Sequence, residues 1–514
     1  MSTFRFCIAF GVTTLLLANY AFAQQGGPPA PGANSTPAAQ LPLSGRNGQG
    51  GSVTATETPV PGTTSSVNTL NTTVQVQGPY AGSTLSRVPF SGKLSLREAV
   101  RRGLEYNLGA VGLNNAVRQA RGQQRVARSS LLPNLNGALR ESVQQTNLKA
   151  LGVRIQLPFP GVSIPSIVGP FNYFDLRATL TQTVADMTAL NNYRSAREIA
   201  RANQHTAKDA RDLVVLAVGG AYLQAIAARA RVASAHAQLE TAAALYQQTL
   251  DRRKSGLLAQ IDVNRSLVQQ ETQQQRVATL ENDFAKQKIN LARLTGLPPN
   301  DRYELTDEVP FAPAPPITEE DALQRALDSR ADLKAALAQV RASERSRSAA
   351  RAERLPSLAL STDYGAIGTN PAQSHGTFTV AGTLRFPIWQ GGRTEGDIEQ
   401  AEASLDQRRA EVEDMRGRVE SDVRDAFLDL QAATNQVEVS RTNQRVARET
   451  LDLTRQRYDA GVTDSVEVVQ SHEGVASADL DYITSLFAHN LAKLSLARAI
   501  GRAEESFPLF LKLQ

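Results

Sequence analysis

Two stretches of the chain repeat one pattern: Arg253-Lys-Ser-Gly-Leu-Leu-Ala-Gln-Ile-Asp-Val-Asn-Arg-Ser266 and Tyr458-Asp-Ala-Gly-Val-Thr-Asp-Ser-Val-Glu-Val-Val-Gln-Ser471. At a single offset of 205 residues, Gly256 aligns with Gly461 and Asp262 aligns with Glu467. In each stretch a glycine ends a long helical pattern, and an acidic residue follows where the next helix begins. The pattern therefore predicts two copies of one antiparallel helical hairpin. A single such turn would fit any pair of helices, but its duplication carries information about the whole fold.

The duplication extends toward the N-terminus. Ser95 and Glu98 form a capping box that opens an amphipathic helix, and a matching helix start follows Ile317 at an offset of 223 residues. We expect the first copy to span residues 91–300 and the second to span residues 317–501.

The two copies differ in length. The offset falls from 223 to 205 along the chain, so the first copy carries 18 additional residues between about 135 and 180. Insertions are tolerated best at surface connections, and we therefore expect a loop there.

The first residues have the features of an export signal. Residues 1–23 contain Arg5, an apolar run from Cys7 to Leu17, and small residues at Ala21 and Ala23, a pattern that predicts a secretory signal peptide. The only cysteine lies in this segment, so we expect no disulfide in the mature chain. We also expect no later transmembrane helix, because no window of about 20 apolar residues follows. Any contact with a membrane would then be made by strands.

Three segments lie outside the two copies. Residues 24–90 are rich in Gly, Pro, Ser, Thr, Gln and Ala, and we expect a low-complexity, disordered leader. Residues 301–316 form a proline-rich linker between the copies, and residues 502–514 form a short C-terminal tail without a clear signal.

Four segments alternate between apolar and polar residues, which predicts strands with one apolar face. They are residues 174–184, 377–388, 358–366 and, more weakly because Glu141 falls on the apolar face, 135–143. The alternative is the edge of a soluble sandwich. However, isolated hairpins are not stable alone, and each segment approximates the 9–11 residues that cross a bilayer at a tilt.

Two long helical patterns without proline follow the strands, at residues 187–255 and 392–459. In the second, apolar residues recur at steps of three, four and seven, as in a coiled coil. A helix of this length is about 100 Å long at 1.5 Å per residue, which is too long for an ordinary globular core. The fold class is therefore mainly α, with a duplicated unit of long helical hairpins and four strands per chain.

Composition and motifs exclude other classes. The net charge is only +5, from 55 basic and 50 acidic residues, so no nucleic-acid partner is indicated. The five histidines lack metal-ligand spacing, and neither a phosphate-binding loop nor a serine nucleophile elbow is present. We expect no catalytic, cofactor or metal residues and no enzymatic activity.

Over nearly all of residues 91–501, the chain resembles the TolC-like outer-membrane efflux proteins. The resemblance rests on the two glycine-containing tips, Leu132-Pro133, Leu355-Pro356, Phe386-Pro387-Ile388 and Gly391-Gly392. It implies a homotrimer whose chains share a 12-stranded outer-membrane β-barrel and a helical cylinder in the periplasm. An open four-stranded sheet would leave unpaired edges in lipid, so closure by several chains is also expected physically.

The resemblance also implies a function. Such proteins are the exit ducts of tripartite efflux pumps or type I secretion systems, and they dock on a periplasmic adaptor and through it on an inner-membrane transporter. The alternative class is a periplasmic coiled-coil adaptor without its own pore, which would show one hairpin flanked by lipoyl-like strands. This chain shows two hairpins, each preceded by strands. Drugs, metal ions and proteins all remain open as cargo.

In the family, polar links between a tyrosine, an acidic residue and a basic residue near the tips close the aperture. Tyr458 and Asp262 match the first two, whereas Thr463 occupies the basic position. We expect closure through a hydrogen bond from Tyr458 to Asp262 and through helix packing, with Glu467 adding acidity that favours cations. The alternative is that Tyr458 only packs on the neighbouring helix.

The resemblance gives the exposed tips a second role. Gly256 with Leu257, and Gly461 with Val462, are expected to contact the adaptor, because small residues let another backbone approach closely. The alternative is that these glycines only end the helices.

Overall fold

A computed structural model describes residues 51–60, 69–85, 90, 92–150, 152, 165–298, 300, 302–308, 311–314 and 316–511. The predicted signal peptide and the first part of the predicted leader, residues 24–50, lie outside the described residues. So do residues 512–514 of the predicted tail.

The short helices confirm the duplication. Helix α6 begins and ends 223 residues after α2, and α7 begins and ends 223 residues after α3. At the predicted capping box, Ser95 Oγ accepts a hydrogen bond from the Glu98 N–H at 3.2 Å, and Thr318 caps α6 in the same way. The helices are α2 (Leu96–Tyr106), α3 (Leu108–Ser129), α6 (Glu319–Ser329) and α7 (Ala331–Ala352).

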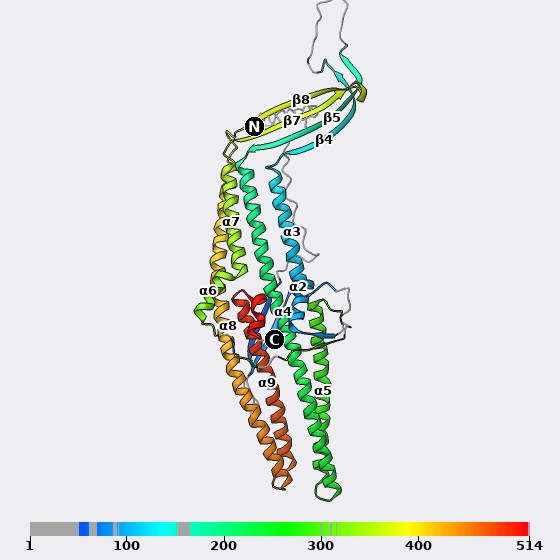
Figure 1. Cartoon of the computed structure of the whole chain (residues 1–514), viewed down its shortest axis with the longest axis vertical. Helices are drawn as coiled ribbons and strands as arrows, with labels where there is room; N and C mark the ends of the chain where they lie inside the picture. Colours follow the sequence, from blue (N-terminus) through cyan, green and yellow to red (C-terminus); the bar gives the residue numbers. More distant parts are fainter. Residues whose placement is uncertain are drawn as a thin grey trace, which may run out of the picture. The chain divides into compact units, whose positions relative to one another are not determined.

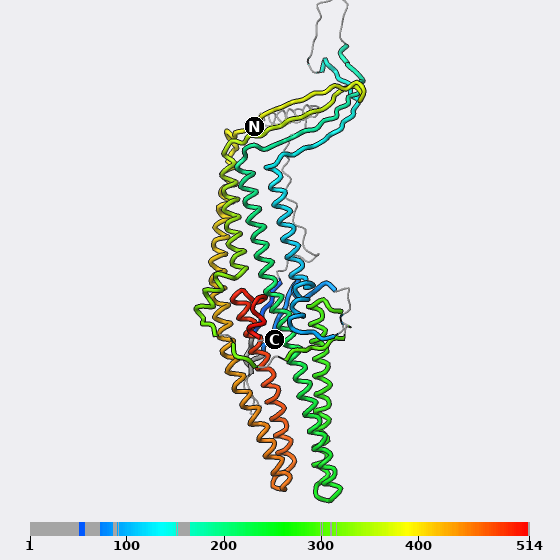
Figure 2. Tube along the Cα trace, in the orientation of Figure 1, coloured from blue at the N-terminus to red at the C-terminus, as the bar shows by residue number. Residues whose placement is uncertain are grey.

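Two long antiparallel hairpins follow, coloured green and orange in Figure 2. The first consists of α4 (Met187–Lys254) and α5 (Gln260–Thr295), and the second of α8 (Arg393–Asp459) and α9 (Ser465–Ala499). The long helices start and stop within one residue of the predicted bounds. Within each hairpin the two helices pack along their length, and small or branched apolar residues are buried at helical spacing on α8, from Val412 to Val437.

All four predicted strands are present in one antiparallel sheet, in the order β4-β5-β7-β8 (Figure 1). They are β4 (Asn134–Asn147), β5 (Ile167–Ala185), β7 (Ser357–Gly368) and β8 (His375–Arg385). The additional residues of the first copy fall in longer strands and in the connection 148–166, of which residues 151 and 153–164 lie outside the described part. Strand β4 forms despite Glu141, because it pairs with β5 along its length.

The two faces of this sheet differ as the alternation predicts. Leu139 lies opposite Leu176, and Tyr364 lies opposite Phe378, and these four apolar side chains are exposed. The other face carries Arg177, which pairs with Asp175 at 3.3 Å and with Asp363. The outer strands β4 and β8 each leave one edge unpaired within this chain.

The predicted disorder of residues 24–90 is wrong for its second half. Strands β1 (Val53–Val60) and β2 (Thr69–Val76) pair antiparallel, and a 3₁₀ turn, η2 (Gly78–Ala81), follows. Tyr80 is buried, and its carbonyl accepts a hydrogen bond from Asn107 Nδ2 at 2.8 Å. Val53 and Tyr80 thus belong to the core that the helices form, and Val74 packs against it, which composition alone cannot reveal.

The linker and tail are also more ordered than their composition indicates. Residues Tyr303–Leu305 form β6, which pairs in parallel with β3 (Gly92–Leu94) at the start of the first copy. In the predicted tail, α10 (Ala503–Phe510) places Phe507 and Phe510 in the core.

The reason given for expecting no later transmembrane helix, the lack of a long apolar window, is corrected by the structure. Within the described residues, α4 contains an 18-residue window with a mean hydropathy of 1.6, long and apolar enough to cross a membrane. However, 72% of this window is buried inside the fold, as is typical of a core helix.

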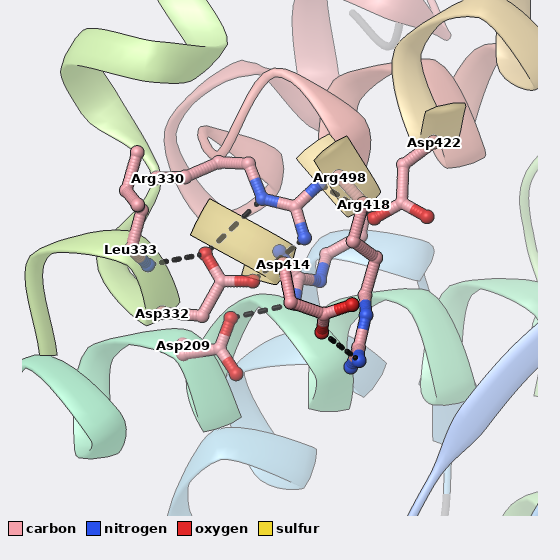
Figure 3. Close-up of polar contacts among 8 residues, drawn as sticks. All are labelled: Asp209, Arg330, Asp332, Leu333, Asp414, Arg418, Asp422 and Arg498. Carbon is pink, nitrogen blue, oxygen red and sulfur yellow. Dashed lines mark hydrogen bonds and ion pairs between the residues drawn. The ribbon is translucent and has the colours of Figure 1, made fainter. Parts of the chain in front are cut away.

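A buried ionic cluster joins four helices at the level of the short helices (Figure 3). The guanidinium of Arg330 contacts Asp332 and Asp422, each at 2.6 Å, and Arg498 on α9 contacts Asp209 on α4 at 2.5 Å. Burial alone would lower the pKa of Arg330, but the hydrogen bonds to both carboxylates outweigh it and raise the pKa. The cluster therefore ties the α8–α9 hairpin to α7 and α4.

Candidate gate and docking site at the helical tips

Both hairpins turn through the same backbone motif. Gly256 and Gly461 adopt φ angles of 76° and 71°, a conformation that glycine reaches without strain. The N–H of Leu257 donates to the Arg252 carbonyl and the N–H of Val462 donates to the Arg457 carbonyl, each at 2.9 Å, as in a Schellman motif. The glycines therefore end the helices as predicted.

The residues after each tip glycine are the most open part of the hairpins. Leu257 is 74% exposed and Val462 is 68% exposed. No atom lies within 4 Å of the place where a side chain would begin on either glycine. Two apolar side chains and two bare backbone turns are thus available to a partner at the same end of both hairpins.

A set of contacts that the sequence did not predict joins the two hairpins at this end, and we call it the tip link. Arg252 on α4 pairs with Asp459 on α8 at 2.7 Å, and Gln248 donates to the same carboxylate at 3.0 Å. The guanidinium of Arg252 also lies 4.6 Å from the centre of the Tyr458 ring. Tyr458 packs with Leu245 of the first hairpin and is buried.

The predicted hydrogen bond between Tyr458 and Asp262 is absent. Within the described residues the Tyr458 hydroxyl has no hydrogen-bond partner, and Asp262 accepts a hydrogen bond from Ser465 Oγ at 2.8 Å. The bond fails because the Tyr458 ring lies under Arg252, while Ser465, at the start of α9, reaches the carboxylate first. Burial raises the pKa of the Tyr458 phenol, Arg252 opposes this rise and Asp262 adds to it.

Glu467 lies in the first turn of α9, as expected, but its charge is compensated. Arg457 donates to its carboxylate at 2.9 Å, and Thr463, at the position where the family has a basic residue, donates a second hydrogen bond. Glu467 is therefore one half of an ion pair in this structure, and its effect on cation preference at the mouth stays a prediction.

Just above the tips, several contacts between the two hairpins are polar. Gln269 and Gln273 on α5 both donate to Glu473 on α9, at 2.6 and 3.1 Å. Further up, Asp479 on α9 accepts a hydrogen bond from Ser234 on α4 at 3.2 Å. Hydrogen bonds of this kind can be exchanged for bonds to water, whereas the apolar packing within each hairpin cannot. The tips can thus separate more easily than the upper parts of the hairpins, where Phe487, Leu491 and Leu494 of α9 share a buried apolar core with α4.

The tip link explains how Tyr458 can matter without a hydrogen bond. We expect Tyr458→Phe to leave stability and conductance unchanged, because the hydroxyl makes no bond that phenylalanine would lose. Tyr458→Ala should destabilise the chain by about 3 kcal/mol through the lost packing. Thermal unfolding of the purified protein measures the change in stability, and planar-bilayer recording measures the change in conductance. A raised conductance of the Tyr458→Phe channel would contradict this expectation and support a hydrogen bond between Tyr458 and Asp262 instead.

Two long hairpins attached to an open sheet with an apolar outer face define the subunit of a membrane-embedded duct. A family model described as "Outer membrane efflux protein" matches residues 114–297 and 322–502, which is most of the chain. The chain therefore belongs to the outer membrane efflux protein family, and it is an outer-membrane channel of the TolC-like type with its helical part in the periplasm.

Individual relatives agree with this assignment. The chain is 25% identical to outer membrane protein OprJ of Pseudomonas aeruginosa, over 81% of this chain and 86% of OprJ. It is 24% identical to outer membrane protein TolC of Escherichia coli, over 63% of this chain and 69% of TolC. The crystal structure of the Campylobacter jejuni CmeC outer membrane channel has the same fold, with a TM-score of 0.68 at 16% identity, covering 79% of this chain and 86% of CmeC.

Proposed function

We propose that the chain is one of three identical subunits of a passive exit duct. The open four-stranded sheet carries this proposal, because its apolar face is exposed and strands β4 and β8 leave their outer edges unpaired. In lipid each unpaired backbone group costs several kcal/mol, so the edges must be closed by other copies. Three chains of four strands give a closed barrel of 12 strands.

The continuous covalent path from sheet to helices supports a shared cylinder below the barrel. Strand β5 ends at Ala185 and α4 begins at Met187, and β8 ends at Arg385 and is followed by α8 from Arg393, so each pair of strands leads into a long helical hairpin. Three chains would then supply six hairpins around one axis. This duct moves cargo without chemistry of its own.

We further propose that the tips dock on a periplasmic adaptor, and through it on an inner-membrane transporter of an efflux pump or a type I secretion system. The exposed Leu257 and Val462, beside the open glycines Gly256 and Gly461, support this role, because they offer apolar contact and close backbone approach.

Cysteines at Leu257 and Val462 are expected to cross-link to the adaptor in cells, using a short bifunctional thiol-to-amine reagent. A matched control places cysteine at Leu428, which is also exposed but lies far from the tips on α8. An adaptor band of equal strength from Leu428→Cys, or none from the tip variants, would contradict tip docking.

The tips are also proposed to form the gate. The tip link between Arg252 and Asp459 holds the two hairpins together in each chain, and the hydrogen bond from Ser465 to Asp262 adds a second contact. Release of these contacts would let one hairpin of each chain move outward. Tyr458 takes part through its packing on Leu245, whereas the bond of Glu467 to Arg457 stiffens the tip of the second hairpin.

A further inference from the structure

The same pair of hydroxyl groups joins the two helices of each hairpin near its tip. Thr454 on α8 and Ser471 on α9 bond at 3.1 Å in the second hairpin. At the offset of 205 residues they correspond to Thr249 and Ser266, which bond at 2.7 Å in the first hairpin. The two hairpins can therefore be compared position by position at this level.

The next position on each helix differs between the two hairpins. The first hairpin has Leu250 and Leu267, whereas the second has Arg455 and His472. The His472 side chain is buried, and its Nε2 lies 3.2 Å from a terminal guanidinium nitrogen of Arg455. Of these two matching pairs, the second alone contains a group that titrates near neutral pH.

The contact between Arg455 and His472 requires a neutral imidazole. A guanidinium has donors and no acceptor, so Arg455 must donate and Nε2 of His472 must accept. A proton on Nε2 would replace the hydrogen bond by two facing donors and two like charges in a buried place. Burial and, after it, the charge of Arg455 lower the pKa of His472 from its ordinary 6.5 to about 4.

The other charges near this contact do not stabilise a protonated His472. Within the described residues, Arg455 is the only charged group whose field shifts the pKa of this histidine. Neighbouring charges on α5, α8, α9 and α4 are held by other partners: Arg276 by Glu473, Arg457 by Glu467, and Arg252 by Asp459 in the tip link. In the described part of the chain, no carboxylate therefore offsets a second positive charge beside Arg455.

This pair lies one helical turn above the packing that joins the two hairpins. Val468 precedes His472 by four residues on α9. It forms a buried cluster with Tyr458 and with Leu245 of the first hairpin. The Tyr458 ring also lies under Arg252 of the tip link. A change in the separation of α8 and α9 at His472 therefore displaces the surface that meets the first hairpin.

We infer that acid releases the tips, because protonation of His472 separates α8 from α9 at this level and loosens the closed arrangement. This inference rests on the proposed gate. The neutral ring fits the closed arrangement, which is fully stabilised above pH 6.5 and loses stability as the pH falls from 6.5 to about 4. A ring that regains its ordinary pKa on opening raises the ratio of open to closed forms by at most about 30-fold per chain between pH 7.5 and pH 5.

Planar-bilayer recording between pH 7.5 and pH 5 tests the inference, because histidine titrates in this range while carboxylates ordinarily stay charged. The wild-type conductance is expected to rise severalfold at pH 5. His472→Gln keeps a neutral acceptor for Arg455, so it should remove this rise and leave the conductance at pH 7.5 unchanged. His472→Leu combined with Arg455→Leu places the leucine pair of the first hairpin in the second, and it should also remove the rise.

The matched control is His236→Gln. His236 lies in the first hairpin, is exposed, and bonds to Glu281 at 3.0 Å. This variant should keep the acid response of the wild type. A second measurement is thermal unfolding of the purified protein, in which the melting temperature should fall more from pH 7.5 to pH 5 in the wild type than in His472→Gln.

The outcomes separate acid release from the gate itself. Equal pH profiles of wild type and His472→Gln, in conductance or in melting temperature, would overturn the inference. A flat wild-type profile together with a raised conductance in Arg252→Ala combined with Asp459→Ala would overturn acid release and leave the gate in place. Conductance that responds neither to acid nor to that double substitution would overturn the gate as well.

Discussion

Arg330→Ala is expected to lower the free energy of unfolding by about 3–5 kcal/mol, because it leaves the largely buried carboxylate of Asp332 without its cation. The Arg330 side chain is only 4% exposed and contacts both Asp332 and Asp422. Burial disfavours the charged form of Asp332, and Arg330 is the main group that lowers the pKa of this carboxyl. Urea unfolding at one fixed protein concentration measures the loss.

Arg418→Ala is the matched control. Arg418 is drawn beside the cluster in Figure 3 and pairs with Asp414 at 2.9 Å, but its side chain is 60% exposed. An exposed pair of this kind contributes about 0–1 kcal/mol. Equal losses from both substitutions would show that the cluster does not hold the hairpins together.

Leu384→Lys is expected to prevent assembly in the outer membrane, whereas Thr383→Lys should be tolerated. Leu384 is exposed on the apolar face of β8, and Thr383 is on the other face of the same strand. A lysine facing lipid costs about 2–4 kcal/mol at the middle of the bilayer and less toward its surfaces, and the proposed trimer would multiply this cost by three. A lysine facing a water-filled lumen costs little.

Heat-resistant trimers in isolated outer membranes measure this effect, with total protein in the cell as the reference. Phe378→Lys, also on the apolar face, should behave like Leu384→Lys. If both faces of β8 accept lysine equally well, the strand does not contact lipid as assigned.

The sequence alone was enough to predict those elements whose periodic pattern is present in both copies. The long helices and the four strands have strong periods, and each was supported by its counterpart in the other copy. The helix stops at Gly256 and Gly461 were predictable for the same reason, since a positive φ angle requires glycine. These features depend on local chemistry, which the sequence displays directly.

Features that depend on contacts between distant segments were missed. The strands β1 and β2 are stabilised by helices that follow much later in the chain, so their polar composition indicated disorder. Likewise, Arg252 and Asp459 are ordinary surface residues in the sequence, and only the approach of the two hairpin tips brings them together. The expected bond of Tyr458 was transferred from a family pattern whose third residue, at Thr463, differs in this chain.

Single-channel conductance in planar bilayers tests the central claim, that the tip link holds the duct closed. Asp459 is mostly exposed, so the ion pair to Arg252 contributes about 1 kcal/mol or less per chain, and up to about 3 kcal/mol at a shared aperture. Arg252→Ala combined with Asp459→Ala is expected to raise the mean conductance severalfold. The matched control removes Asp251 and Lys254, which pair at 3.0 Å within one hairpin and should change nothing. Wild-type conductance in the Arg252 and Asp459 variant, or an equal rise in the control, would contradict the account.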